Sequence, residues 1–262
     1  MKALSTFRKF SKKPPTIHMT VEGVMSRNKE VATLVSECIG VWADIEFSHG
    51  SLLAAMLHTT DPHVTVAMYL SLSSAHSRGA VLDAAADKAL TARELDLYEA
   101  VMNFVEGAYD ERNKLAHWCW GYCDELPDGL VLIDPRYRMQ YLARNFRKST
   151  PPTPLDLRHV FLVRKQDVEN ILERLTPVRH YVSLLGGAIW RENSESDRAA
   201  LRRLLSDEPA VQKWLDDLNK SRLEKREEAL QRKPSPPRAK EPSAKQRRDA
   251  ALKKRALKKR GA

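Results

Sequence analysis

Three long stretches of this chain place apolar residues at three- and four-residue steps, and this helical period constrains the fold more than any other feature. The stretches cover residues 30–57, 91–121 and 167–187. Each would form a helix with one apolar stripe, which must be covered by another element. The sequence therefore predicts a mainly α protein built as an up-and-down helical bundle.

Local signals support the predicted helices. Thr91-Ala-Arg-Glu94 fits a capping box, in which the hydroxyl and the carboxylate each bind a free backbone amide at the helix start. Asp61-Pro62 is a second start signal, before a run at 63–90 that is helix-permissive and has an unusually small apolar face. We expect one helix over that run.

Extended segments are expected between the second and third long helices. Residues 126–129, Leu-Pro-Asp-Gly, read as a turn, and residues 130–133 followed by 137–142 read as a short β-hairpin insertion. A further extended run covers residues 160–163, and Asp167 would cap the helix that follows. We expect Gly186 and Gly187 to end that helix.

Charge is distributed very unevenly along the 262 residues. From residue 220 onward there are 17 Lys or Arg and 5 Asp or Glu, a net charge of +12, so the remainder carries −2 of the overall +10. Proline at 234, 236 and 237 and a lack of apolar residues predict a disordered basic tail. The expected organisation is a basic N-terminal arm at 1–25, a helical domain at 26–190, C-terminal helices at 191–232 and the tail at 233–262.

Cysteine content and hydropathy bear on the compartment. Three cysteines, Cys38, Cys119 and Cys123, cannot form a disulfide framework, and the amino terminus lacks the apolar core of a secretory signal. No stretch approaches the roughly 20 apolar residues of a membrane span. We expect a cytoplasmic protein without a membrane partner.

Residues 110–117, Asp-Glu-Arg-Asn-Lys-Leu-Ala-His, contain Arg112, Asn113 and His117 near the end of the second long helix. This Arg-Asn-x-x-x-His pattern resembles the signature of the HEPN superfamily. Trp42 and Glu46 on a long first helix, a small-residue second helix and aromatics after the motif agree with the resemblance, which covers roughly residues 28–187. The resemblance implies a helical bundle that forms a homodimer and acts as a metal-independent endoribonuclease, often as a toxin or in defence.

These residue types suit RNA cleavage without a metal or other cofactor. A histidine can accept and return a proton, and an arginine can stabilise charge on the phosphate oxygens. At about 100° per residue, Asn113 lies within about 40° of His117, so its amide is expected to hold an imidazole nitrogen. Arg112 lies about 140° away, and the resemblance implies that a two-fold dimer completes the site.

Glu46 is a candidate supporting residue. It shares a face of the first helix with Trp42, His49 and Leu53, and a carboxylate on an otherwise apolar face requires a partner. One candidate partner is Arg112, which Glu46 would then orient. The alternative is a structural buried pair that involves Glu46 and His49.

Other readings of the motif region stay open. Arg174 and His180 form a second Arg-x-x-x-x-x-His pair, but on a helix with Pro177 and without the polar follower. Arg112 and His117 can instead form an ordinary helix end with a structural ion pair. The set His117, Cys119 and Cys123 has no C-x-x-C spacing, so no metal site is expected.

The aromatics Trp118, Trp120 and Tyr122 can stack bases, fill a core or form a dimer seam. The tail repeats Ala-Leu-Lys-Lys-Arg at 251–255 and 256–260. Its expected nucleic-acid-binding residues are Lys253, Lys254, Arg255, Lys258, Lys259 and Arg260, which would attract RNA or DNA phosphates in a salt-sensitive way. The alternatives are a solubilising extension without a specific partner and a segment that binds an acidic protein.

Two functions from different classes follow. The first is a metal-independent endoribonuclease whose partner is RNA and whose toxin role would imply an antitoxin or other protein partner. The alternative is a noncatalytic helical dimer module that binds nucleic acid or a protein.

Overall fold

The structure, a computed structural model, describes residues 1–19, 22–146 and 154–231. The chain divides into two units, Met1–Leu215 and Asp216–Ala262, and of the second unit the structure describes residues 216–231, which belong to helix α9. The α-helices are α1 (Val24–Arg27), α2 (Lys29–Leu57), α3 (Pro62–Ser71), α4 (Ala75–Ala89), α5 (Ala92–His117), α6 (Pro135–Asn145), α7 (Lys165–Ile189), α8 (Glu195–Asp207) and α9 (Pro209–Gln231). The strands are β1 (Lys2–Ala3), β2 (Ile17–His18), β3 (Cys119–Cys123), β4 (Gly129–Ile133) and β5 (Val160–Arg164), with short 3-10 turns at Leu4–Thr6, Arg8–Ser11 and Leu157–His159.

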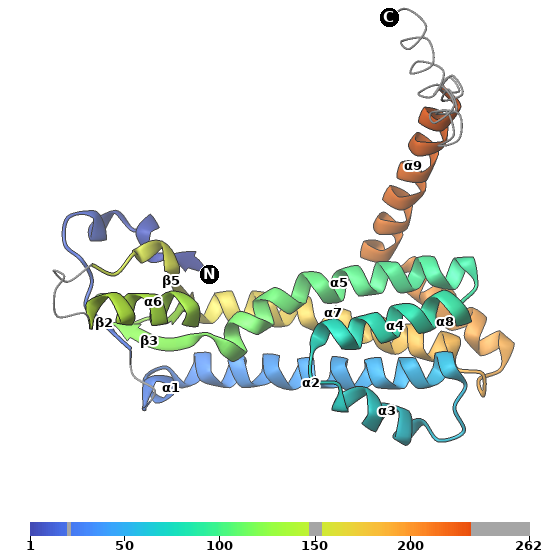
Figure 1. The fold of residues 1–262 in the computed structure, drawn as a ribbon, viewed down its shortest axis with the longest axis horizontal. Helices are drawn as coiled ribbons and strands as arrows, with labels where there is room; N and C mark the ends of the chain where they lie inside the picture. Colours follow the sequence, from blue (N-terminus) through green and yellow to red (C-terminus); the bar gives the residue numbers. More distant parts are fainter. Residues whose placement is uncertain (20–21, 147–153, 232–262) are drawn as a thin grey trace, which may run out of the picture. The chain divides into compact units, whose positions relative to one another are not determined.

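Helices α2, α5 and α7 run alongside one another and form the body of the first unit (Figure 1). The side chain of Asn28 caps α2 by accepting from the amide of Val31 at 3.2 Å. The predicted apolar stripes of all three helices are buried in one core, which confirms the mainly helical fold.

The capping box at the start of α5 is present as predicted. The amide of Glu94 donates to the Thr91 hydroxyl at 3.4 Å, and the Thr91 amide donates to the Glu94 carboxylate at 3.0 Å. The helix ends at His117, short of the expected Gly121, because the chain enters strand β3 at Cys119.

The predicted single helix over residues 63–90 is wrong. The structure has two helices there, α3 and α4, and Ser74 caps the second by accepting from the Ser77 amide at 3.0 Å. Serine side chains compete for backbone groups, so the pair Ser73-Ser74 favours a new helix start over continuation.

Helix α7 also differs at both ends from its prediction. It begins at Lys165, so Asp167 lies inside the first turn, where its carboxylate accepts from the Arg164 amide at 3.0 Å and pairs with the amino terminus. It continues past Gly186 and Gly187 to Ile189, because the residues beyond the glycines, Ala188 and Ile189, are buried in the core.

The β-structure is larger than the expected hairpin. Five strands form an antiparallel sheet in the order β1-β5-β4-β3-β2, which lies at the end of the bundle where α2 begins and α5 ends (Figure 1). The hairpin joins β3 to β4, with Gly121 opposite Val131. Residues 137–142, expected as a strand, lie instead in α6, because Asp134 caps that helix by accepting from the Arg136 amide at 2.7 Å and Pro135 takes its first position.

The expected irregular arm at residues 1–25 is corrected as well. β1 pairs with β5 and β2 pairs with β3, so the N-terminal residues supply both outer strands of the sheet. Leu4 and Phe10 are buried in a second core beneath it. This burial of apolar side chains orders the N-terminal segment that its basic residues indicated as an arm.

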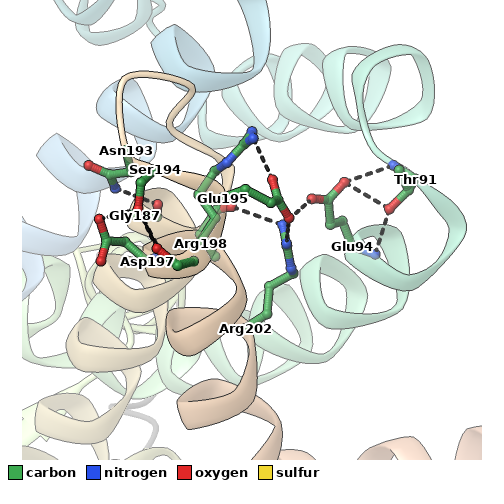
Figure 2. Close-up of polar contacts among 11 residues, drawn as sticks. Thr91, Glu94, Gly187, Asn193, Ser194, Glu195, Asp197, Arg198 and Arg202 are labelled. Carbon is green, nitrogen blue, oxygen red and sulfur yellow. Dashed lines mark hydrogen bonds and ion pairs between the residues drawn. The ribbon is translucent and has the colours of Figure 1, made fainter.

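Helix α8 belongs to the first unit, although the sequence placed it outside the helical domain. Figure 2 shows Arg202 between Glu94 and Glu195, and its distance to the Glu94 carboxylate is 3.0 Å. This contact ties α8 to the start of α5, and Leu205 is fully buried in the same core. Within the described residues, no helix is long and apolar enough to span a bilayer.

Candidate active site

The last two turns of α5 bring the predicted motif together within one chain. A terminal nitrogen of Arg112, Nη1, lies 3.1 Å from Oδ1 of Asn113 and 3.4 Å from Nε2 of His117. The expectation that a second copy is needed to bring Arg112 and His117 together is therefore corrected. The angular argument describes where each side chain leaves the helix, whereas the long arginine side chain reaches around it.

Asn113 has a different partner from the one expected. Its side-chain oxygen accepts from Arg112 rather than holding the imidazole of His117. With Nε2 of His117 accepting from the guanidinium, a neutral imidazole carries its proton on Nδ1. Asn113 thus orients the arginine, and His117, at the exposed end of α5, keeps a face open to solvent.

Arg112 is half-buried without an acidic partner among the described residues. Its guanidinium carbon lies 5.6 Å from the ring centroid of Trp42, and its buried Nε has no hydrogen-bond partner in the described part of the chain. A guanidinium can donate five hydrogen bonds in a planar fork, and here several stay unused. The site therefore has an open capacity for an anion.

Glu46 does not orient Arg112. Its carboxylate pairs with Arg78 of α4 at 3.2 Å, and both side chains are about one-fifth exposed. Helix α4 packs against α2 and brings Arg78 to this face, which satisfies the acid that the sequence left without a partner.

The second Arg and His pair stays apart. Arg174 turns to Glu111 and forms an ion pair of 2.6 Å, while His180 is exposed and lies near the ring of Tyr181. Glu111 directly precedes Arg112, so the same turn of α5 binds one arginine through its carboxylate and leaves the other without an acid.

Cys119 and Cys123, which follow the motif, each contact a charged side chain of the same chain. The thiol of Cys123 donates to a Glu125 carboxylate oxygen at 3.2 Å, and burial raises its pKa to about 11. Arg138 donates to the sulfur of Cys119 at 3.5 Å. Among the residues described, no group of three potential ligands is placed to hold a metal ion.

The aromatics of this region are engaged within the chain. The indole of Trp120 donates to the Leu115 carbonyl at 3.2 Å, and Trp118 contacts Phe161. Tyr122 is covered by His18 and Arg27, at 4.4 Å and 3.6 Å from its ring. All three rings pack against the main core, which agrees with the core-filling interpretation.

Sequence reasoning missed a cavity of about 460 Å³, here called the bundle cavity, between α2, α3, α4 and α5 and the first turns of α9. The small residues Ala75 and Gly79 line it, and the small apolar face noted on this part of the chain was the available signal. His49 lies at its floor, where burial and the nearby Arg78 lower the histidine pKa to about 4.

The predicted nucleic-acid-binding residues of the tail, Lys253, Lys254, Arg255, Lys258, Lys259 and Arg260, lie outside the described residues. Comparisons with protein-family models, curated proteins and solved structures found no match to this chain.

Proposed function

We propose that this chain is a HEPN-type, metal-independent endoribonuclease that uses Arg112, Asn113 and His117. The observation that supports the proposal most is the 3.4 Å contact between the guanidinium and the imidazole, with no carboxylate of the described residues paired to the arginine. A phosphodiester is an anion that fits a planar guanidinium and places a ribose hydroxyl near the histidine.

In the proposed reaction His117 accepts one proton from the RNA and later returns one to it. The phosphate takes the Arg112 guanidinium away from His117 Nε2, and this nitrogen then accepts the proton of the 2′-hydroxyl. The 2′-oxygen attacks phosphorus, and the bond from phosphorus to the 5′-oxygen breaks. The imidazolium returns a proton to the leaving 5′-oxygen. Arg112 stabilises the charge on the non-bridging oxygens, and Asn113 holds the guanidinium in place. The products are a 2′,3′-cyclic phosphate and a 5′-hydroxyl.

The homodimer implied by the resemblance remains part of the proposal. Each chain already contains a complete Arg112 and His117 pair, so a dimer would set two such pairs in one cleft rather than assemble a divided site. Light scattering at micromolar concentration tests for the dimer. A strictly monomeric protein that cleaves RNA would contradict the proposed dimer but not the proposed reaction.

The chemistry itself is checked by the ends of the products. Purified protein is incubated with a defined RNA in excess chelator, and the same RNA is prepared with a 2′-deoxy sugar at the mapped cleavage position. We expect cleavage with a cyclic phosphate end, and no cleavage at the deoxy position. Cleavage that requires an added metal, or that continues at the deoxy sugar, would overturn the proposal.

A further inference from the structure

The bundle cavity has a floor of aromatic rings. Trp42, Tyr69 and Tyr98 are each almost fully buried at this floor, and Tyr109 and Trp214 also line the space. A volume of about 460 Å³ lies within the range of small-molecule sites, which often occur between the helices of a bundle. Aromatic faces are electron-rich, so they attract cations as well as apolar groups.

Two polar atoms at this floor have no partner. Nε2 of His49 and Nε1 of Trp42 are buried and form no hydrogen bond with any residue that the structure describes, and His49 is only 5% exposed. Buried polar groups without partners are unfavourable. Neither atom has appreciable exposed surface, so a ligand in the cavity contacts the rings of the floor rather than these two atoms.

Negative charge dominates the rest of the lining. Among the described lining residues Arg78 is the one Lys or Arg, and it pairs with Glu46, while three further carboxylates line the cavity, those of Asp83, Glu99 and Glu106. Asp83, Glu99 and Glu106 are all exposed at the cavity mouth. The Tyr98 hydroxyl donates to the Asp83 carboxylate at 2.7 Å. The electrostatics therefore favour a cation and disfavour a phosphate.

We propose that the bundle cavity binds a small organic cation, an amine with an aromatic or similarly apolar body. The body would lie among the rings of the floor, and the ammonium group would face the carboxylates at the mouth. Arg112 is not part of the lining, although Trp42 contacts both the cavity and the Arg112 guanidinium, so amine binding and RNA cleavage are measured separately. Failure of one proposal leaves the other standing.

A charge series on one carbon skeleton tests the ligand class. The full-length protein is titrated by calorimetry with phenethylamine, with neutral 2-phenylethanol and with anionic 3-phenylpropionate. We expect phenethylamine to bind about tenfold more tightly than the alcohol, from cation-π and charge contributions, and the anion to bind most weakly. Equal affinities, tightest binding of the anion, or no binding of the amine at millimolar concentration would each overturn the proposal.

Filling the cavity tests the location without weakening the fold. An added Cβ at Gly79, in the middle of α4 and in the cavity wall, meets no atom within 4 Å. Gly79→Leu should abolish phenethylamine binding and leave the melting temperature equal or higher, because glycine is a poor helix former. The matched control is Gly107→Leu on α5, which also has open space and lies outside the cavity.

A second pair of variants tests the charges. Combined Glu99→Gln and Glu106→Gln should weaken phenethylamine binding about tenfold and leave 2-phenylethanol binding unchanged. Glu173→Gln, which removes an exposed carboxylate on α7 away from the cavity, should change neither. Binding by Gly79→Leu as tight as wild type, or equal losses in Gly79→Leu and Gly107→Leu, would show that the amine does not bind in this cavity.

Discussion

Arg112 is held in position by neighbouring side chains but has no acidic partner within the described residues, which favours binding of an anion. It is half-buried beside Trp42, held by Asn113, and free of any acid within the described residues. Arg174 shows the contrasting case, since Glu111 neutralises it at 2.6 Å. An unpaired guanidinium at a protein surface is ready to bind a phosphate, whereas a paired one must first break its ion pair.

His49 gives a prediction about pH and stability. Burial, with a smaller contribution from Arg78, lowers its pKa from 6.5 to about 4. Above pH 6.5 the imidazole is neutral in both folded and unfolded chains and contributes nothing. Between pH 6.5 and 4 the unfolded chain binds a proton that the folded chain does not, so the folded state loses about 3 kcal/mol across this window.

Replacing His49 with leucine should remove this loss. The free energies of unfolding of wild type and His49→Leu, measured in urea from pH 8 to 4, should run parallel above pH 7. Below pH 6.5 the free energy of unfolding of His49→Leu should fall less than that of wild type. Curves that stay parallel down to pH 4 would show that the imidazole is protonated in the folded protein.

At the scale of elements, the strength of the sequence signal decided what could be predicted. The long helices α2, α5 and α7 each repeat the helical period over more than five turns, so their existence and stripes were predictable. Strands β1 and β2 have two residues each, too few for any period, and only their long-range pairing reveals them. Asp134-Pro135 fits both a turn and a helix start, and in the structure the Asp134 side chain caps α6 with Pro135 at its first position.

The site was predictable in the same uneven way. The motif named Arg112, Asn113 and His117, but the contacts among them depend on side-chain rotamers that spacing does not fix. The pairing of Glu46 with Arg78 depends on how α4 docks on α2, and the bundle cavity depends on residues from five helices at once. Neither of these features is encoded in a local pattern.

Gly121 provides a test of the β2 and β3 pairing. A Cβ at this position would lie 2.5 Å from the His18 carbonyl oxygen and 3.1 Å from a methyl group of Val131. Gly121→Ala should therefore push β2 away from β3 and cost about 1–3 kcal/mol. Hydrogen exchange should show faster exchange at residues 16–18 and 122–124.

The control for this test is Gly40→Ala on the exposed side of α2, where an added Cβ meets nothing. It should stabilise the protein by up to about 1 kcal/mol. Unchanged exchange at β2 in Gly121→Ala would contradict the close approach of the two strands.

At the scale of the whole molecule, the hydrophobic cores and the excess of positive charge lie in different parts of the sequence. The unit Met1–Leu215 contains both hydrophobic cores, the Arg112 site and the bundle cavity. The excess of positive charge lies beyond residue 220. We therefore expect folding and catalysis to depend on the first unit, and RNA affinity to depend strongly on the basic segment.

Deletion of residues 233–262, which carry 12 Lys or Arg, tests this division. The melting temperature should stay unchanged, while RNA affinity should fall at least about tenfold at low salt and become less salt-dependent. Replacing the six basic residues of the repeat at 251–260 with glutamine should give a smaller loss of the same kind. A lost thermal transition, or an unchanged salt dependence, would contradict the division.

The most direct test of the central claim compares two pairs of variants in one RNA cleavage assay with excess chelator. The motif variants Arg112→Ala and His117→Ala should each lose about 100-fold or more in single-turnover rate, and the control variants Arg174→Ala and His180→Ala should stay close to wild type. If wild type leaves the RNA intact, or if the motif variants cleave as fast as the controls, the guanidinium and imidazole at the end of α5 are not an active site.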